Sequence, residues 1–445
     1  MGLWKSRLLT SVAFAGLVAS CAAVPPASDT LPPPIVPPLE QPDEVEPTGV
    51  EAISFKSSGH DGIDEWRDDF SARMLEKGHA PSLVKALLSD LKPISMWLGN
   101  DFQAAATGIG DQAEFSKPIW DYLKVPLGNT RISTGTKKLR ADPAMFDALE
   151  ARYGVDREVL AAIWGMETSY GSYIGTFNAA NALANMAVEG RRRSFAESEL
   201  LALAKIVERG DATADDLIAG WAGAMGQTQF MPTTYLSYAA DFEGDGRIDV
   251  WGNEADALAS AANYLAKSGY AAGQPWGFEV KVPSNFNYAL ADGKERRVTT
   301  WKNAGLSPIG GGAFETGGAD FAELWLPAGA EGPKYLLFHN FSVFKKYNRS
   351  DSYAFAVGMV AQTLGGDSGP VTAWPTHLKP LSVANIKLLQ AGLNKRGFDA
   401  GVVDGIPGRR TKSALQKYQA SIGVTADGYP TMEMLDFLEG RASPS

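Results

Sequence analysis

The sequence predicts an α+β protein that is mainly helical, with a small β region and a compact helical unit near its C-terminal end. Apolar residues recur at helical spacing through most of residues 55–270, as in REVLAAIWGMET and ADALASAANYLAKSG. From about residue 275 the segments FEVKV, RRVTTW, AELWLP and KYLLFHNF are short and rich in β-branched and aromatic residues, which is typical of strands. Helical spacing returns at 352–364, and residues 379–441 combine short helical patterns with glycine turns.

Length and composition favour a globular protein of several domains and exclude some functional classes. At roughly 100–200 residues per domain, the chain of 445 residues allows two to four domains. Lys and Arg number 41 against 51 Asp and Glu, and the resulting net charge of −10 argues against a general nucleic-acid binder. The single cysteine, Cys21, excludes an internal disulfide and a thiolate zinc site, and the four scattered histidines do not form a metal motif.

The first 20 residues are predicted to be an export signal that ends at a lipid attachment point. A basic start precedes an apolar run over residues 8–18, which is too short to span a bilayer comfortably. The segment Val18-Ala19-Ser20-Cys21 then resembles the bacterial lipobox, in which the cysteine is acylated after export. A simple secretory signal is the alternative. Residues 21–55 are rich in proline and predict an extended tether, or plain disorder that serves the same purpose.

The remainder of the chain is predicted to form two domains of unequal size. We expect the main domain over residues 56–366, a linker over 367–378 and a small domain over 379–441. The linker prediction depends on the segment GGDSGPVTAWPTHL, which is rich in glycine, proline, serine and threonine.

One glutamate stands where it can act as an acid. Glu167 ends the apolar helical run IWGMETSYG and is flanked by Trp164, Met166 and Tyr170. Burial among such side chains disfavours the charged form, so we expect the pKa of Glu167 to be raised. A carboxyl group that is still protonated near neutral pH can donate a proton to a leaving oxygen. A helix-end glutamate that faces solvent is the alternative.

Two further motifs supply amide and aromatic side chains. AGAMGQTQFMP contains Gln229 and Phe230, and YNRSDSY contains Tyr347, Asn348 and Tyr353. Amides can hydrogen-bond to hydroxyl and N-acetyl groups, and flat ring faces can pack against the C–H side of a sugar ring. The combination favours a carbohydrate as substrate.

Together, GMETSYG, AGAMGQTQFMPTTY, DFEGDGRIDVW, ADALASAANYL and YNRSDSY resemble the motifs of the membrane-bound type B lytic murein transglycosylases. The match runs in order over about residues 60–365. The resemblance implies a lysozyme-like helical catalytic domain with an added small β region. It also implies cleavage of the β-1,4 bond between N-acetylmuramic acid and N-acetylglucosamine in peptidoglycan without water, so that the product carries a 1,6-anhydromuramyl end.

The resemblance further assigns roles to single residues. Glu167 matches the one catalytic carboxyl group, which acts first as acid and then as base, and no second acid stands near its motif. Substrate contacts are implied for Gln229, Phe230, Tyr122, Arg192, Arg193, Tyr264, Tyr347, Asn348 and Tyr353. Three consecutive arginines, 191–193, leave the register of the basic pair open. Core packing is the alternative for the tyrosines, and a solvated helix end for the arginines.

No cofactor is expected to be required, and calcium is a candidate ligand of one acidic loop. Asp241-Phe242-Glu243-Gly244-Asp245-Gly246 begins like an EF-hand, whose oxygen ligands stand at positions 1, 3 and 5 and whose glycine stands at position 6. Position 12 is Gly252 where a bidentate glutamate is needed, and the next acid is Asp256. A structured acidic turn over Asp241–Asp256 is the alternative.

The C-terminal segment 388–438 resembles the small three-helix peptidoglycan-binding domain through Leu389-Gln390, Val403-Asp404-Gly405 and Asp427-Gly428. We therefore expect a monomer that binds peptidoglycan strands, does not bind nucleic acid and is lipid-anchored on the periplasmic face of a membrane, the outer one by analogy. Two alternatives remain. One is a hydrolytic muramidase in which Asp241 or Asp245 activates water, and the other is a wall-binding lipoprotein without catalysis.

Overall fold

The computed structural model describes residues 52–98, 117–379 and 381–443. The signal segment, Cys21 and nearly all of the tether therefore lie outside the described residues. The chain divides after Ala52, and the unit from Ile53 onward carries the fold that follows. In the described ranges, no helix combines the length and the apolar character that crossing a membrane requires.

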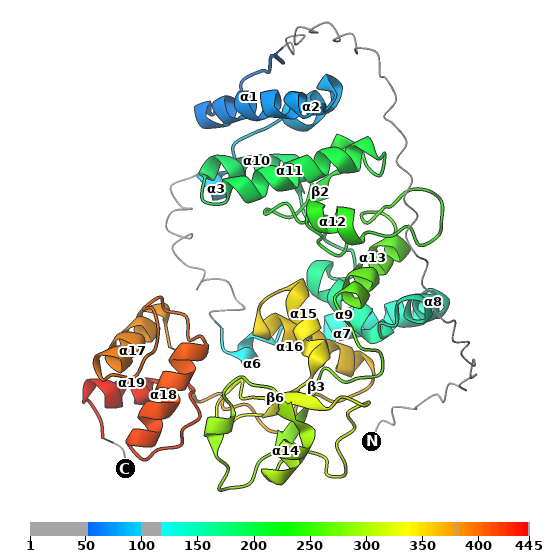
Figure 1. The fold of residues 1–445 in the computed structure, drawn as a ribbon. Coiled ribbons are helices and arrows are strands. Elements are labelled where there is room, and N and C mark those ends of the chain that lie inside the picture. The colour runs from blue at the N-terminus through cyan, green and yellow to red at the C-terminus, as the bar shows by residue number, and fades with distance from the viewer. Residues whose placement is uncertain (1–51, 99–116, 380, 444–445) are drawn as a thin grey trace, which may run out of the picture. The chain divides into compact units, whose positions relative to one another are not determined.

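One group of helices forms around α10 and α11, which lie side by side (Figure 1). Its members are α1 (Asp61–Glu76), α2 (Pro81–Leu88), α3 (Ser95–Leu98), α10 (Ala179–Glu189), α11 (Arg193–Glu208) and α12 (Pro232–Tyr238). Alanines such as Ala180 and Ala184 are buried along α10, so neighbouring backbones can approach closely. The buried amide of Asn185 accepts from the Ile94 N–H and donates to the Lys92 carbonyl, which holds the segment before α3 against α10.

A second group of helices surrounds α9, the helix that ends with the GMET motif. It comprises α6 (Ile119–Tyr122), α7 (Asn129–Ala141), α8 (Pro143–Tyr153), α9 (Arg157–Thr168), α13 (Glu254–Lys267), α15 (His339–Tyr347) and α16 (Asp351–Leu364). Every residue of α9 from Val159 to Gly165 is buried, which is why the apolar run of this helix is nearly continuous. Helix α16 packs along α9 and brings the YNRSDSY motif to it.

The β region is a five-stranded antiparallel sheet in the order β4-β6-β7-β3-β5. Its strands are β3 (Gly277–Lys281), β4 (Arg296–Arg297), β5 (Ser307–Pro308), β6 (Phe321–Trp325) and β7 (Tyr335–Leu337). Leu336 of β7 stands opposite both Phe278 of β3 and Leu324 of β6. Elsewhere, β1 (Phe177–Asn178) pairs with β2 (Ile218–Ala219), and short 3₁₀ turns lie at Ala214–Asp216 and Tyr288–Leu290. The expected small β region is confirmed.

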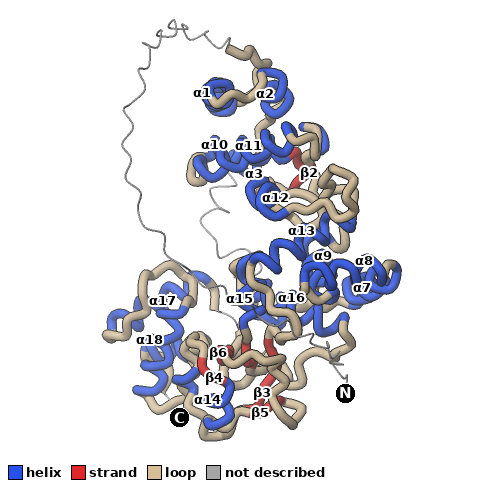
Figure 2. Tube along the Cα trace, turned by 45° about the vertical axis from the view of Figure 1, so that its right-hand side comes forward, coloured by secondary structure: helices blue, strands red, loops and turns tan. Residues whose placement is uncertain are grey.

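The prediction of a strand over RRVTTW is largely wrong. Only Arg296–Arg297 pair in β4, and α14 (Val298–Asn303) follows directly beside the sheet (Figure 2). Val298 and Trp301 stand three residues apart, so a helix turns both toward the sheet, where the indole N–H of Trp301 donates to the Ala322 carbonyl at 2.8 Å. Burial of this indole overrides the strand preference of the β-branched residues around it.

The segment expected to be a linker is held against the β region. The carboxylate of Glu279, which is 7% exposed, accepts from the main-chain N–H of Val371 at 2.6 Å and of Thr372 at 2.9 Å. These residues therefore have defined partners on β3, which glycine and proline content alone does not predict.

The C-terminal unit comprises α17 (Val383–Lys395), α18 (Arg409–Ser421) and α19 (Met432–Glu439). Gln390 donates to the Asp404 carboxylate and accepts from the Gly405 N–H. Gln419 makes the same pair of bonds with Asp427 and Gly428. Both glycines have positive φ, +87° and +72°, a backbone conformation that residues with a side chain rarely adopt. The two Asp-Gly turns are thus held by the same pair of hydrogen bonds. The predicted α+β, mainly helical fold class with three C-terminal helices is confirmed.

Candidate active site

Glu167 is the next-to-last residue of α9 and is hydrogen-bonded from α16. The phenol of Tyr353, which lies in the first turn of α16, donates to Oε1 of Glu167. Tyr353 is buried, and burial together with the negative charge of Glu167 raises its pKa well above the ordinary value. The phenol therefore keeps its proton at neutral pH and acts only as a donor to the carboxylate.

The turn after α9 has an unusual backbone. Ser169, Tyr170 and Gly171 have φ values of 49°, 63° and 77° in succession. Among the described residues, the only other non-glycine with positive φ is Gln229, in the second motif. The turn folds Tyr170 back onto Trp164, where the rings meet edge to face at 5.6 Å. A side chain at Gly165 would place its Cβ 2.6 Å from the Tyr170 ring, so this motif requires glycine there. Such strain concentrates at functional sites.

Gln227 joins the two motifs, and we call its set of bonds the Gln227 bridge. Its main-chain carbonyl accepts from the Thr168 hydroxyl at 2.6 Å, and its side-chain Oε1 accepts from the Trp164 indole N–H at 3.0 Å. Its Nε2 donates to the Trp251 carbonyl at 3.2 Å. Because Gln227 is 4% exposed, these bonds are sheltered from water and fix the end of α9 to the loop that follows Gly223. Nothing in the residue types or spacing of the sequence predicts this role for Gln227.

Gln229, a predicted substrate residue, spans from this loop to the turn after Glu167. Its Nε2 donates to the Gly226 carbonyl at 2.9 Å and to the Ile174 carbonyl at 3.2 Å. Its Oε1 lies 3.1 Å from where a Cβ on Gly220 would stand. The amide nitrogen is therefore committed to the protein, and the partly buried side chain lies where the two motifs meet.

Three predicted aromatic residues form one cluster beside this loop. The ring of Phe230 lies 5.9 Å from that of Tyr264 and 6.0 Å from that of Tyr347, and the two tyrosine rings are 5.2 Å apart. The Tyr347 hydroxyl donates to the Thr228 carbonyl, and that of Tyr264 to the Lys346 carbonyl, both at 2.6 Å. The resemblance implies substrate contact by Phe230, which stays a prediction; its side chain is 2% exposed and packs against both tyrosine rings.

The remaining predicted residues of YNRSDSY and α6 also lie at this site. Burial and then the Glu167 charge raise the pKa of Tyr347 well above its ordinary value, which places Tyr347 in the field of that carboxylate. Tyr122, at the end of α6, adds to the rise in the pKa of Tyr353. The Asn348 Oδ1 accepts from the Ser350 N–H at 3.0 Å and shapes the turn between α15 and α16.

Comparison with known proteins gives the family. The model described as the transglycosylase SLT domain matches residues 62–362, more than half of the chain. The chain belongs to this family. A second model, described as a peptidoglycan binding domain, matches residues 382–438 of the transglycosylase. The expected family, with its lysozyme-like helical fold, is confirmed.

Individual relatives agree with this family. Membrane-bound lytic murein transglycosylase B of Escherichia coli K12 is 33% identical over 219 residues, which cover 48% of this chain and 58% of that protein; the chain thus spans little more than half the length of this relative. Two structures of SltB3 from Pseudomonas aeruginosa, one with NAG-anhNAM-pentapeptide and one with NAG-NAM-pentapeptide, are 42% identical, with a TM-score of 0.79. They cover 85% and 84% of this chain, which covers 99% of each. The expected enzyme class, a lytic murein transglycosylase, is confirmed.

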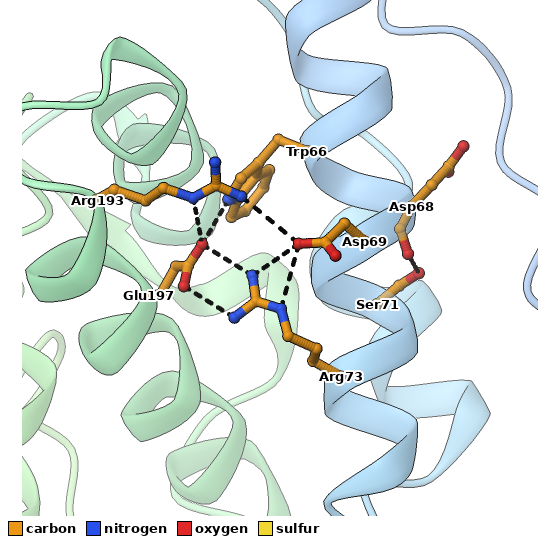
Figure 3. Close-up of polar contacts among 7 residues, drawn as sticks. All are labelled: Trp66, Asp68, Asp69, Ser71, Arg73, Arg193 and Glu197. Atoms are coloured by element: carbon orange, nitrogen blue, oxygen red, sulfur yellow. Dashed lines mark hydrogen bonds and ion pairs between the residues drawn. The ribbon is translucent and has the colours of Figure 1, made fainter.

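The predicted basic pair of this transglycosylase, Arg192 and Arg193, contacts side chains of α1 and α11. Figure 3 shows Arg193 of α11 beside Glu197, to which its Nε donates at 2.9 Å, and Asp69 of α1, 3.5 Å away. Arg73 donates to both oxygens of Glu197 at 2.9 Å. The Arg192 guanidinium lies over the Phe195 ring at 4.4 Å. Arg193 therefore fastens α1 to α11, and substrate contact by Arg192 or Arg193 stays a prediction.

Glu197→Gln is expected to lower stability at neutral pH by about 1–3 kcal/mol and to have almost no effect near pH 2. Burial raises the pKa of Glu197, but hydrogen bonds from Arg73, Trp66 and Arg193 outweigh it and lower the pKa from 4.5 to about 2. This stabilisation is fully present above pH 4.5 and is lost as the pH falls toward 2, because the unfolded chain binds the proton first. Urea unfolding of both proteins across this range measures the difference. An equal difference at both ends would contradict the pairing.

In the acidic loop of the transglycosylase, aspartate oxygens accept hydrogen bonds from main-chain N–H groups. Asp241 accepts from the Gly244 N–H at 2.6 Å and the Gly246 N–H at 2.8 Å, and the bond from Gly246 contributes most to lowering its pKa. Both oxygens of Asp256 accept main-chain N–H groups, from Phe242 and Asp249. Nowhere in the described part of the chain do three or more His, Cys, Asp or Glu side chains gather as a metal would require.

Proposed function

We propose that this transglycosylase cleaves the β-1,4 bond between N-acetylmuramic acid and N-acetylglucosamine in peptidoglycan, with Glu167 as its single acid and base. The observation that carries the proposal is the bond from the Tyr353 phenol to Glu167, which fixes one carboxyl group beside the Gln229 loop and the Tyr264–Tyr347 cluster. Amide and aromatic groups around one oriented carboxyl suit a sugar substrate. The P. aeruginosa relative, with its bound NAG-anhNAM-pentapeptide, supports the same substrate class.

The chemistry follows from one carboxyl group that is used twice. Protonated Glu167 gives its proton to the glycosidic oxygen as the bond from that oxygen to C1 of the muramyl sugar breaks. The resulting carboxylate then takes the proton of the 6-hydroxyl of the same sugar, whose oxygen bonds to C1 and closes the 1,6-anhydro ring. Glu167 is protonated again at the end. An internal nucleophile needs no bound water, because the attacking oxygen is already held within the substrate.

A hydrolytic muramidase would instead need a second carboxylate to activate water. The two acids considered for this role are Asp241 and Asp245. Both accept main-chain N–H groups of their own loop, Asp241 from Gly244 and Gly246, and Asp245 from Arg247 at 2.9 Å. These bonds favour a structural role for the loop.

Mass spectrometry of digested sacculi tests the proposed reaction. We expect muropeptides with anhydro ends, about 18 Da lighter than reducing ends because one water is absent. Reducing ends alone would identify a hydrolase. Intact sacculi that remain bound to the protein would identify a wall-binding protein without catalysis.

We propose that the Asp241–Asp256 loop is a structured turn that requires no ion. A similar structure, that of E. coli Slt35, is a complex with calcium. It is 25% identical to this chain with a TM-score of 0.55, and the match covers 67% of this chain and 92% of that one. In this chain the oxygens of Asp241 and Asp256 already accept main-chain hydrogen bonds. Calcium added to chelator-treated protein is expected to give no binding heat and no change in melting temperature. A saturable heat with a rise in melting temperature would assign the loop to calcium.

We propose that acylation of Cys21 anchors the protein to the periplasmic face of the outer membrane. The lipobox-like Val18-Ala19-Ser20-Cys21 supports acylation, and the peptidoglycan binding domain match over residues 382–438 supports a place at the wall. Cys21→Ser is expected to move the protein from the membrane fraction to the soluble periplasmic fraction. A variant that remains with the membrane would contradict the anchor.

A further inference from the structure

The ring of Tyr170 lies between three helices, beside the turn that follows Glu167. A Cβ on Gly165 of α9 would lie 2.6 Å from the ring, and a Cβ on Gly135 of α7 would overlap the phenol oxygen. The same Cβ on Gly135 would lie 2.8 Å from Cδ2 of Leu364, the last residue of α16. We call the space between Gly135, Gly165 and Leu364 the Tyr170 slot. Because Tyr170 is only 4% exposed, the slot encloses its ring almost completely.

The shape of the Tyr170 ring, and not its polar group, is what the slot uses. The hydroxyl is buried, and within the described ranges no protein group hydrogen-bonds to it. Burial raises the pKa of Tyr170 to about 12, although the charge of Arg131 opposes this rise. The phenol is therefore uncharged at neutral pH and contributes to the slot by filling it.

The main chain at Tyr170 is held in a conformation that non-glycine residues seldom adopt. Ser169 and Tyr170 have φ values of 49° and 63°. The Tyr170 N–H donates to the Trp164 carbonyl of α9 at 3.2 Å. Such a backbone persists only where its surroundings impose it. The ring in the slot and the N–H on α9 together fix where this helix ends, two residues after Glu167.

The slot also joins α9 to α16, the helix that orients Glu167. Leu364 ends α16 at the slot, and Tyr353, in its first turn, donates to Oε1 of Glu167. The two helices pack along each other between these points, and α7 packs against both. An atom added in the slot must push one of the three helices aside, because the ring is enclosed. Such a movement changes how the Tyr353 phenol meets Glu167.

We propose that Tyr170 is a positioning residue, and that its ring in the Tyr170 slot fixes the Glu167 carboxyl group relative to Tyr353. The inference rests on the proposed function, because it takes Glu167 as the acid and base. A misplacement of about 1 Å can cost about 100-fold in rate. Because Tyr170 is buried and contacts no substrate, a disturbed slot is expected to lower kcat and to leave KM unchanged.

Two glycine variants, Gly135→Ala and Gly165→Ala, test the slot, each alone and combined with Tyr170→Phe. The methyl group added at Gly135 overlaps the phenol oxygen, which Tyr170→Phe removes. The close contacts that remain are 2.8 Å to Leu364 Cδ2, the end of a flexible side chain, and 2.9 Å to Cζ of the ring. The methyl group added at Gly165 lies 2.6 Å from Cζ and 3.0 Å from Cε1, atoms that phenylalanine keeps. The same second substitution therefore relieves one clash and not the other.

Each glycine variant is expected to lose about 100-fold in kcat, with KM on soluble glycan strands unchanged. Adding Tyr170→Phe is expected to restore about tenfold to Gly135→Ala and less than about twofold to Gly165→Ala. Tyr170→Phe alone is expected to keep most of its kcat, because the ring still fills the slot. The measurement is release of anhydro ends at a temperature at which every variant is folded by circular dichroism. Equal rescue of both glycine variants, or rescue of neither, would overturn the proposal.

Gly332→Ala is the matched control. Gly332 is buried in the segment between β6 and β7, and its added Cβ would lie 2.5 Å from the Ala328 Cβ. This variant is expected to lower the melting temperature by overpacking while kcat stays unchanged. A loss of kcat equal to that of Gly135→Ala would make the effect one of general destabilisation and overturn the positioning role.

Tyr170→Leu supplies a second test if the glycine variants do not fold, since it adds no volume to the slot. It is expected to lose at least about tenfold in kcat, because a smaller side chain leaves the end of α9 free to move. Full kcat in this variant would overturn the proposal. Failure of the proposed function is distinct, since the unaltered protein would then release no anhydro ends. The melting temperatures would still report the clash at Gly135 and its relief by Tyr170→Phe.

Discussion

Glu167→Gln is expected to lower the rate of anhydro-end release by about 10³- to 10⁴-fold. Glutamine keeps the shape of the side chain and an oxygen that can accept from the Tyr353 phenol, so the local structure is retained. It cannot give a proton to the glycosidic oxygen or take one from the 6-hydroxyl. Because one carboxyl group serves both steps, the variant loses the acid and the base together. The measurement is quantitative mass spectrometry of muropeptides released from sacculi over time.

The control for this variant is its folding. An unchanged melting temperature, together with undiminished binding to sacculi, would show that the loss is chemical. Full lytic activity in Glu167→Gln would assign the acid to another residue and reopen the muramidase alternative. Tyr353→Phe separates orientation from chemistry: it removes only the phenol that bonds to Glu167, so a smaller loss is expected.

Gln227→Leu is expected to lower kcat by about 100-fold although Gln227 touches no reacting atom in the proposed mechanism. Leucine fills a similar volume but leaves the Trp164 N–H and the Trp251 carbonyl without their partner. The end of α9 then loses part of its attachment to the loop, and the carboxyl of Glu167 shifts. Two buried polar groups without partners also lower stability by about 2 kcal/mol. The measurements are urea unfolding and kcat on a tetrasaccharide of the repeating N-acetylglucosamine and N-acetylmuramic acid unit.

Gln390→Leu is the matched control for this result. Gln390 is another buried amide, 1% exposed, that holds a turn through Asp404 and Gly405 of the C-terminal unit. Its replacement is expected to destabilise that unit while leaving kcat on the tetrasaccharide unchanged. If both variants lower kcat equally, the effect of Gln227 is general destabilisation and the positioning role is wrong.

The sequence predicts the chemistry of the site better than its support. Glu167, Tyr353 and Gln229 stand in motifs that resemble those of the lytic transglycosylases, and the structure brings these motifs together. The Gln227 bridge could not be predicted, because it depends on two partners that are distant in sequence. These are the buried indole of Trp164 in α9 and the carbonyl of Trp251. An amide in a glycine-rich loop looks the same in sequence whether it meets substrate or protein.

Residue type also fails where long-range packing decides. The VTT run predicts a strand, but the burial of Trp301 against Ala322 makes it a helix. The resemblance implies substrate contact for Arg192 and Arg193, which stays a prediction, but it gives no sign that Arg193 meets Asp69, which lies far earlier in the chain. In both cases the deciding partner is distant in sequence, so no local pattern could contain it. The helices could be predicted more fully, because the apolar spacing that indicates a helix lies within the helix itself.

The bond between Glu167 and Tyr353 joins residues 186 positions apart, and this separation affects the order in which activity arises during synthesis. A growing chain that already carries Glu167, Gln227 and Gln229 still lacks the phenol that orients the acid. Closing so long a loop is entropically costly and slow, so the oriented carboxyl forms late in folding. A fragment that ends before α16 lacks both this phenol and the helix that packs along α9, so we expect lytic activity only once α16 has been made and packed.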